Sequence, residues 1–170
     1  MSSYQSPLGI IWIASDPTGI IRLQMPCTRG KERFLEALNH RYGLPKGSFT
    51  PGGPVNSRLV LELEAYFSGK KKNFSIPVHL NGTAFQKRVW KRVSQIPFGK
   101  TRSYGQIAAD LNIPKGGRAV GQANRINPVP LIIPCHRVIA SDGTLGGYSP
   151  GIKQKRWLLK WETQNQNARS

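Results

Sequence analysis

Cysteine and histidine are scarce in this chain of 170 residues. Its cysteines are Cys27 and Cys135, and it has three histidines. So few cysteines do not suggest a disulfide-stabilised scaffold, and no Cys/His cluster has the spacing of a zinc site. The sequence therefore offers little support for a structural metal. It indicates a protein of a reducing compartment, cytoplasmic or, in a eukaryote, nuclear.

Long apolar runs and acidic residues are also missing. No run approaches the length that spans a membrane, and the N-terminus lacks the charged-then-apolar pattern of a signal peptide. Eight acidic residues oppose 25 basic ones, giving a net charge of +17, and residues 81–170 hold 15 of these bases but only three of the acids. Such an excess favours polyanions. We expect a nucleic acid rather than an acidic membrane, because no basic amphipathic helix with a broad apolar face stands out.

The first half of the chain has the pattern of strands followed by helices. Residues 8–14 and 19–24 are rich in β-forming side chains, and the turn signal between them predicts a hairpin. Residues 31–41 have apolar positions at helical spacing, with an end near Gly43. A second helix is predicted from Asn56, whose side chain would cap it.

From about residue 77 the chain becomes basic and helical. Thr83 is predicted to cap one helix, and Ser103 with Gln106 forms a capping-box pattern at the start of another. A short turn and a helix from about residue 116 to 126 follow, which is the order of a helix-turn-helix.

We therefore predict an α+β protein of two domains, since 170 residues suffice for two small domains or one larger one. A small N-terminal domain, residues 1–76, combines a β-hairpin or sheet with helices. A mostly helical C-terminal domain, residues 77–170, contains the helix-turn-helix. The polar tail, residues 164–170, is expected to be disordered.

The segment Ile133-Pro134-Cys135-His136-Arg137 is the most informative in the chain. Only the thiolate of a cysteine is a good nucleophile, and a histidine within reach can take the thiol proton near neutral pH. Pro134 fixes its own φ and pushes Ile133 towards an extended conformation, so the chain enters Cys135 in a defined direction. A buried, purely structural cysteine is the alternative that the residue alone leaves open.

The thirteen residues 127–139, NPVPLIIPCHRVI, closely resemble the active-site signature of the O6-alkylguanine-DNA alkyltransferases. Members of this family take an alkyl group from guanine onto their own cysteine. The similarity extends over the C-terminal half, where it includes GTAFQ at 82–86, IPFGKTRSY at 96–104, RAVG at 118–121, GGY at 146–148 and WLL at 157–159. Residues 1–80 are much less diagnostic, although their order of strands and helices fits the family.

The resemblance implies the residues that carry the chemistry. Cys135 would be the nucleophile, His136 would accept its proton, and Glu162 would orient the imidazole. Tyr104 would protonate or polarise the guanine ring as the base leaves. Asn127 would tie the helix-turn-helix to the active-site loop.

The resemblance also implies where the base and the DNA bind. Arg118 would fill the place of a nucleotide flipped out of the duplex, and its helix would enter the minor groove. A backbone N–H of Ser149 would meet the guanine oxygen. The residues expected around the base are Pro130, Val138, Tyr148 and Ser149. Those expected at the DNA are Thr101, Ser103, Gly116, Gly117, Arg118, Ala119, Gly121 and Arg125.

Together these features predict DNA repair by a protein that acts once. The alkyl group of O6-alkylguanine, and also of O4-alkylthymine, would pass irreversibly from duplex DNA to Cys135. No cofactor is expected, because the protein itself is the acceptor. The expected partner is double-stranded DNA bound by a monomer, and cooperative binding along the DNA stays open.

Three other functions stay open at this point. A non-catalytic recogniser of alkylguanine would keep the fold but replace the nucleophile, and Cys135 argues against it. A helix-turn-helix regulator with a redox-sensing cysteine would bind one sequence and need no pocket. A hydrolytic cysteine enzyme would turn over many times and need an oxyanion hole, which the sequence does not identify.

Overall fold

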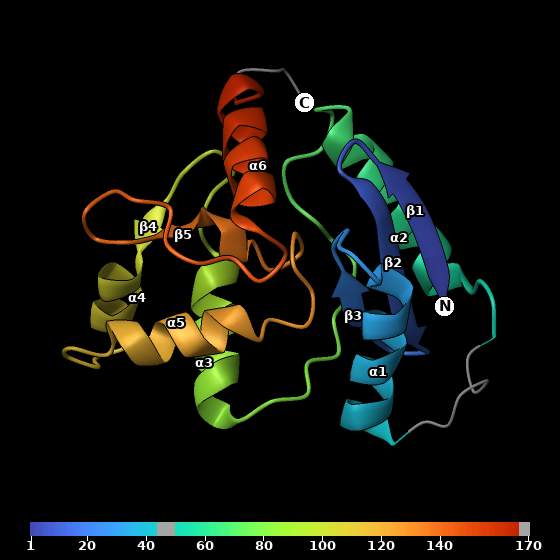
Figure 1. The fold of residues 1–170 in the computed structure, drawn as a ribbon, viewed down its shortest axis with the longest axis horizontal. Helices are drawn as coiled ribbons and strands as arrows, with labels where there is room; N and C mark the ends of the chain where they lie inside the picture. The colour runs from blue at the N-terminus through green and yellow to red at the C-terminus, as the bar shows by residue number, and fades with distance from the viewer. Residues whose placement is uncertain (44–49, 167–170) are drawn as a thin grey trace. The chain divides into compact units, whose positions relative to one another are not determined.

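The computed structural model describes residues 1–43 and 50–166, and the chain divides into two compact units. The first unit is Met1–Leu80 and the second begins at Asn81 (Figure 1). A small sheet with two helices forms the first unit and mainly helices form the second, so the predicted α+β fold is confirmed. No helix within the described residues is long and apolar enough to cross a membrane.

The division falls slightly later than the expected boundary after residue 76. The backbone N–H of Ile20 donates to the Pro77 carbonyl at 2.9 Å, and the N–H of His79 donates to the Ile20 carbonyl at 2.9 Å. Residues 77–80 therefore continue the first unit beside its sheet.

Three antiparallel strands, in the order β1-β2-β3, form the sheet of the first unit: β1 (Ser2–Ser6), β2 (Gly9–Asp16) and β3 (Gly19–Gln24). The predicted hairpin is β2–β3. Its turn is closed by Asp16, whose Oδ1 accepts the backbone N–H groups of Thr18 at 2.7 Å and Gly19 at 3.0 Å. Strand β1 was not predicted, because four of its five residues are serine or glutamine and give no alternating apolar signal.

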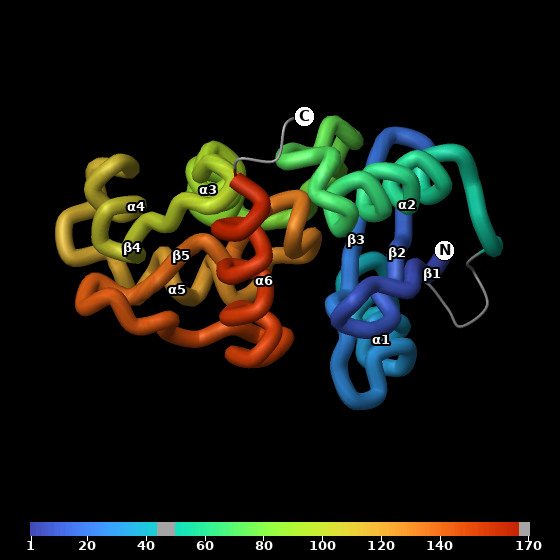
Figure 2. Tube along the Cα trace, turned by 90° about the horizontal axis from the view of Figure 1, so that it is seen from above, coloured from blue at the N-terminus to red at the C-terminus, as the bar shows by residue number. Residues whose placement is uncertain are grey.

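Two helices, α1 (Gly30–Tyr42) and α2 (Pro54–Phe67), lie on opposite sides of this sheet (Figure 2). Phe34 of α1 packs in one core cluster with Ala14 and Ile21 of the sheet, and Phe67 of α2 stacks on Tyr4. Both faces of β2 are therefore covered, which explains its nearly continuous apolar sequence.

Asn56 is not the N-cap that the sequence predicted. Helix α2 begins at Pro54, Gly53 occupies the N-cap, and Asn56 lies buried in the first turn, where its Nδ2 donates to the Gly52 carbonyl at 3.0 Å. Proline is favoured at the first helical position, where its missing N–H has no intrahelical acceptor, so the helix starts earlier than a side-chain cap would indicate.

The second unit is built around packed helices. Helix α5 contacts both α3 and α4, and α4 with α5 forms the predicted helix-turn-helix. The parallel pairing of β4 with β5 brings the start of α4 beside the segment that follows Cys135. The elements are α3 (Ala84–Ser94), β4 (Arg102–Ser103), α4 (Tyr104–Asp110), α5 (Gly117–Arg125), the 3-10 helix η1 (Cys135–Arg137), β5 (Val138–Ile139) and α6 (Ile152–Gln164).

Two capping boxes begin α3 and α4, as the sequence predicted. The Thr83 hydroxyl accepts the N–H of Gln86 at 3.2 Å, and the Ser103 hydroxyl accepts the N–H of Gln106 at 3.1 Å. Each glutamine side chain in turn accepts the backbone N–H of its cap residue. Both helix starts are therefore fixed locally.

The expected disorder of the tail does not begin at residue 164. Helix α6 ends at Gln164, Asn165 caps it and donates from Nδ2 to the Trp161 carbonyl, and Gln166 donates to the Gly99 carbonyl. These hydrogen bonds hold residues 164–166 against the helical unit, and residues 167–170 lie outside the described part of the chain.

Candidate active site

Cys135 is the first residue of η1, directly after a tight turn at Pro134. Pro134 has φ −78° and ψ 64°, and the N–H of Cys135 donates to the Ile133 carbonyl at 2.7 Å. This is the geometry of an inverse γ-turn, and the proline ring holds φ near the value that the turn needs. The turn fixes the direction in which Cys135 enters η1, as the sequence predicted.

Two asparagines of the helix-turn-helix region hold the backbone around Cys135. Asn127 donates from Nδ2 to the Ile133 carbonyl at 2.8 Å and accepts the N–H of Val129 at 3.0 Å. Asn124, in the last turns of α5, donates from Nδ2 to the Cys135 carbonyl at 3.2 Å. Helix α5 and the residue that follows its C-cap are thus each bonded to the cysteine loop through one asparagine, of which the sequence singled out only Asn127.

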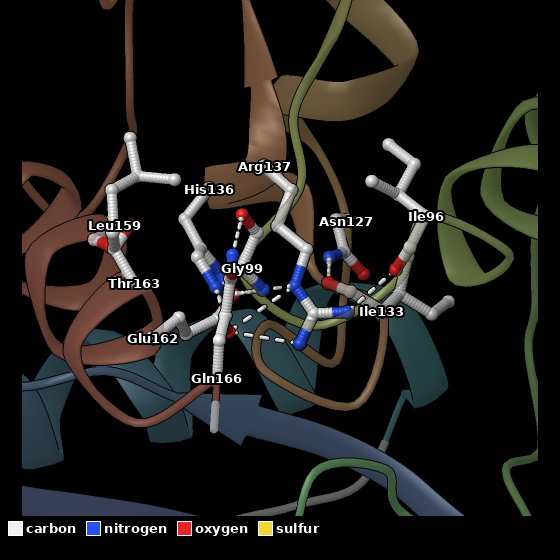
Figure 3. Close-up of polar contacts among 10 residues, drawn as sticks. All are labelled: Ile96, Gly99, Asn127, Ile133, His136, Arg137, Leu159, Glu162, Thr163 and Gln166. Atoms are coloured by element: carbon white, nitrogen blue, oxygen red, sulfur yellow. Dashed lines mark hydrogen bonds and ion pairs between the residues drawn. The ribbon is translucent and has the colours of Figure 1, made fainter. Parts of the chain in front are cut away.

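His136, Arg137 and Glu162 form a buried cluster between η1 and α6 (Figure 3). The His136 Nε2 lies 2.8 Å from the Glu162 Oε1. Arg137 donates from Nε to Oε2 at 2.9 Å and from Nη2 to Oε1 at 2.8 Å. The backbone N–H of Gly99 also donates to Oε2, at 2.9 Å. The sequence paired Glu162 with His136, but it did not assign Arg137 as a second partner.

This cluster fixes the charge of Glu162 and the tautomer of His136. Burial alone would raise the pKa of Glu162, but hydrogen bonds and charge from His136 and Arg137 outweigh it and lower the pKa to about 2. Burial lowers the pKa of His136, which favours neutral imidazole. Because Nε2 then donates to the carboxylate, the lone pair is on Nδ1, which is buried and has no partner among the described residues.

The Cys135 thiol is a weak acid in this structure. The residue is 5% exposed, and burial raises its pKa to about 11, although Asn127, Lys155 and Tyr148 act in the opposite direction. A thiol with this pKa is protonated at neutral pH. Desolvation of the charged form is the larger effect on this pKa, and the transfer of the thiol proton to the neighbouring histidine stays a prediction.

Tyr104, the first residue of α4, lies between two glycines. A Cβ on Gly121 of α5 would lie 3.8 Å from its ring, and a Cβ on Gly146 would lie 3.2 Å from its ring. Its hydroxyl donates to the Gly147 carbonyl at 3.4 Å, and burial raises its pKa. The absence of side chains at the two glycines lets the tyrosine ring fit between α5 and the 143–151 loop.

Lys155 is a buried cation that the sequence analysis missed. Its Nζ donates to the carbonyls of Val138 at 2.5 Å and Gly147 at 3.4 Å, and also to that of Leu145. Burial lowers its pKa to about 8. A sequence signal exists, because Lys155, Leu158 and Glu162 share one face of α6 at helical spacing.

The residues expected to enclose the guanine base lie in two places, beside the Cys135 segment and in the 143–151 loop. Pro130 and Val138 are buried, and Tyr148 is half-buried. Ser149 is exposed, and its hydroxyl donates to the Arg125 carbonyl at 2.8 Å. This bond connects the 143–151 loop to the end of α5.

The residues predicted to contact the DNA differ in their exposure to solvent: some are exposed, and others are packed against neighbouring residues. Gly116 is buried, with no room for a Cβ beside Ile113, and the Ser103 hydroxyl caps α4. Gly117 is partly buried near Tyr104, and Gly121 contacts the same ring. The exposed residues are Thr101, Arg118, Ala119 and Arg125.

No group of three or more His, Cys, Asp or Glu side chains that could hold a metal ion occurs among residues 1–43 and 50–166. The carboxylate of Glu162 is instead bonded to His136 and Arg137, and the Lys155 ammonium to backbone carbonyls.

Comparisons with known proteins agree with this arrangement. Residues 84–164 match the model of the DNA-binding domain of 6-O-methylguanine DNA methyltransferase, and residues 1–80 match the model of its ribonuclease-like domain. The chain belongs to this methyltransferase family.

Relatives cover nearly the whole chain. The methylated-DNA--protein-cysteine methyltransferase of Methanosarcina barkeri is 41% identical over 95% of both chains. That of Mycobacterium tuberculosis is 41% identical over 92% of this chain and 88% of the relative. The crystal structure of the M. tuberculosis protein OGT in complex with DNA has a TM-score of 0.82 and 38% identity, covering 96% of this chain and 92% of that one.

Membership of the methyltransferase family identifies the general activity. The chain is a DNA-binding enzyme that repairs DNA by methyl transfer. The structure adds the arrangement of the side chains around its cysteine.

Proposed function

We propose that the protein repairs O6-alkylguanine in duplex DNA by moving the alkyl group to Cys135, once per molecule. The observation that carries this proposal is the position of Cys135. It is held by the helix-turn-helix through Asn124 and Asn127 and directly precedes a histidine paired with a buried carboxylate. A cysteine that only senses oxidants, or that hydrolyses peptides, would not need to be bonded to a DNA-binding helix-turn-helix.

The proton of the thiol leaves through His136. Its free Nδ1 accepts the Cys135 proton, directly or through one water, and Glu162 stabilises the imidazolium that forms. The thiolate sulfur then bonds to the alkyl carbon while the carbon–O6 bond breaks. The electron pair of that bond stays on the guanine, which takes up one proton.

The guanine is the leaving group, and the protein neutralises it. Tyr104 donates a hydrogen bond or proton to the ring, and the N–H of Ser149 donates to O6. Pro130, Val138 and Tyr148 enclose the base. The thioether formed at Cys135 is not hydrolysed, so each molecule acts once, and O4-alkylthymine is a second substrate.

The target base leaves the stack to reach the buried cysteine, because Cys135 is 5% exposed. Arg118, exposed near the start of α5, fills the vacated place from the minor groove. Gly117, Ala119 and Arg125 of the same helix, with Thr101, contact the DNA backbone. The protein acts as a monomer.

The test is mass spectrometry of the protein after incubation with a duplex that contains one O6-methylguanine. We expect a gain of one methylene mass on the Cys135 peptide, in a 1:1 ratio, with guanine restored in the DNA. The Cys135→Ser variant should bind the duplex and gain no mass. A folded, reduced wild-type protein that binds the lesion and gains no mass would favour a non-catalytic recogniser instead.

The flipping role of Arg118 has its own test. Arg118→Ala should slow repair of the duplex more than reaction with the free alkylated base, because only the duplex requires extrusion. Equal losses on both substrates would contradict that role.

A further inference from the structure

Arg22 and Arg41 are two basic side chains of the first unit that no acidic residue pairs with. Arg22 lies on β3 opposite Ala14, and Arg41 lies in the last turn of α1. All eight acidic residues of the chain belong to its described part, and none of their ion pairs includes either arginine. The protein therefore supplies no paired counter-ion for these two charges.

The two side chains lie close together at the end of α1. Ala14 packs in the core cluster with α1, and opposite residues of an antiparallel pair share a face, so Arg22 lies on the face that α1 covers. The hydroxyl of Tyr42, next to Arg41, donates to the carbonyl of Ile21, next to Arg22, at 3.3 Å. The charge of Arg41 also lowers the pKa of Arg22, although burial has the larger effect.

Both guanidinium groups are buried at one end and open at the other. The Nε of each is buried and has no hydrogen-bond partner among the described residues. Neither side chain is fully buried, and the terminal nitrogens of both are absent from the buried unpaired atoms of this part of the chain. Arg41 interacts with the Tyr42 hydroxyl, whereas Arg22 has no hydrogen bond there. The terminal N–H groups of Arg22 are thus free to donate to an acceptor from solution.

The end of the helix explains Arg41 but not Arg22. Basic side chains are favoured in the last turn of a helix, because its carbonyls carry partial negative charge. Arg22 lies on a strand, where partial burial and a second cation both raise the free energy of its charged form. An anion from solution would lower that free energy, and proteins often give up stability at binding sites.

The donors identify the class of this anion. A guanidinium presents its N–H groups as a rigid fork that matches the oxygens of phosphate or carboxylate, and charge-assisted hydrogen bonds of this kind are strong. A phosphate group has at least two charged oxygens that point in different directions, so a single group can accept from both forks. Chloride has no such directions, and one carboxylate presents both oxygens on one edge.

We propose that Arg22 and Arg41 form a phosphate-binding site on the first unit, in which the terminal N–H groups of both donate to one phosphate group. Both residues lie outside the unit that contains Cys135, and this inference does not depend on the proposed function. Two sources supply the same chemistry, free phosphate in solution and the backbone of a DNA duplex.

The first experiment observes the two side chains directly by NMR. A buried Nε–H exchanges slowly with water, so the arginine Nε–H signals of the ¹⁵N-labelled protein are followed during titration with sodium phosphate. Sodium chloride at equal ionic strength is the comparison. Arg22→Gln and Arg41→Gln assign the signals. Arg33→Gln is the matched control, because it removes an exposed arginine from α1.

We expect the signals of Arg22 and Arg41 to shift saturably with phosphate, with half-saturation on the order of 1 mM, and not with chloride. In Arg22→Gln the remaining Arg41 signal should no longer saturate in this range. Arg33→Gln should respond as the wild-type protein does. The wild-type titration tests the site even where a variant fails to fold.

Urea unfolding measures the same binding through stability. With half-saturation at about 1 mM, about 20 mM phosphate should shift the unfolding equilibrium about twentyfold towards the folded form. Phosphate also stabilises folded proteins by exclusion from their surface, so the readout is the difference between variants at equal ionic strength. The specific shift should persist in Arg33→Gln and disappear in Arg22→Gln and Arg41→Gln.

DNA binding distinguishes the two sources. If the duplex backbone supplies the phosphate, Arg22→Gln should reduce the salt dependence of binding to an undamaged duplex by about one unit on the logarithmic scale. An unchanged salt dependence, together with the saturable shift, would assign the site to free phosphate.

Two results would overturn the phosphate site. One is a wild-type protein whose Arg22 and Arg41 signals respond equally to phosphate and chloride. The other is a phosphate effect on unfolding that is the same in Arg22→Gln as in Arg33→Gln. Either result would leave the two arginines as structural charges at the end of α1, and methyl transfer to Cys135 would be unaffected by it.

Discussion

A few buried polar residues lie around the cysteine of this protein. Cys135, His136, Arg137 and Glu162 are all buried, and Glu162 of α6 is bonded to both His136 and Arg137 of η1. Burial raises the pKa of both Cys135 and Glu162. It keeps Cys135 protonated, whereas the hydrogen bonds and charges from His136 and Arg137 outweigh it at Glu162 and keep that carboxylate ionised.

The raised pKa of Cys135 predicts its reactivity towards a small reagent. In a Cys27→Ser background, the rate of alkylation by iodoacetamide should be half-maximal at a pH of about 11, because only the thiolate reacts. For the same protein unfolded in urea, the half-maximal rate should lie near the ordinary thiol pKa of about 8.5. The measurement is the rate as a function of pH. A plateau below pH 9 in the folded protein would show that the thiolate is stabilised instead.

Glu162 predicts a change in stability and its pH dependence. Glu162→Gln leaves Arg137 buried without its counter-ion and should lower the free energy of unfolding at pH 7 by about 3 kcal/mol. The folded pKa of Glu162 lies below its ordinary value, so its contribution is present above about pH 4.5 and is lost as the pH falls to about 2. Urea unfolding at several pH values should show the difference between the two proteins shrinking below pH 4.5.

The exposed Glu64 provides the control for this variant. Glu64→Gln on α2 should change the free energy of unfolding by no more than about 0.5 kcal/mol at any of these pH values. An equal loss in both variants would mean that the buried cluster contributes no specific stability.

At the scale of elements, short segments are arranged around the cysteine by hydrogen bonds between side chains and carbonyls. Asn124 of α5 and Asn127 just after it hold the 133–135 backbone, and α6 holds the 143–151 loop through Lys155. The loop itself has little regular structure, so its position depends on these bonds.

Lys155→Met should release that loop. Methionine has a similar length but cannot donate, so the carbonyls of Val138, Leu145 and Gly147 lose a buried donor. We expect a loss of about 2 kcal/mol in the free energy of unfolding and faster amide hydrogen exchange in residues 143–151. Lys153→Met, at an exposed position of the same helix, should change neither quantity. Unchanged exchange in the loop of the Lys155 variant would contradict this role.

Elements with local signals were predictable from the sequence, and elements that depend on distant partners were not. The capping boxes of Thr83 and Ser103 involve residues three positions apart, so the sequence contains them completely. Strand β1 is a polar segment that becomes a strand only by pairing with β2.

The same distinction applies to the candidate site. The segment around Cys135 could be predicted because its turn chemistry and its resemblance to a family are local. Lys155 was missed because lysine is almost never fully buried, and only the fold reveals the carbonyls that surround it. Asn124 was missed for a related reason, since its partner lies in another segment.

At the scale of the whole molecule, positive charge is concentrated in the helical unit. Of the three acidic residues after residue 80, Glu162 is buried and Asp110 pairs with Arg92 and Arg102. Asp142, the third, is exposed. Among the described residues it forms none of the ion pairs of this unit, which involve Asp110 and Glu162. The helix that we propose to contact the DNA, α5, lies in this unit, whose positive field attracts the phosphates of any sequence.

Binding to undamaged duplex should therefore weaken steeply with salt. The logarithm of the association constant should fall linearly with the logarithm of the salt concentration, and Arg118→Ala should reduce the steepness by about one unit. Arg33→Ala, on the exposed side of α1 in the other unit, should leave the slope unchanged. Fluorescence anisotropy over a salt series measures both. Equal slopes for wild-type and Arg118→Ala protein would remove Arg118 from the DNA contacts.

The pairing of Arg137 with Glu162 has a consequence for how the reaction ends. Because Arg137 already balances the carboxylate, a proton on His136 makes the buried cluster cationic, and the thiolate is the only new anion that compensates it. In the proposed reaction that negative charge passes to the guanine when the sulfur becomes a neutral thioether. A cationic cluster costs free energy in a medium of low dielectric constant, so the imidazole releases its proton as the guanine takes one up, and the interior returns to neutrality.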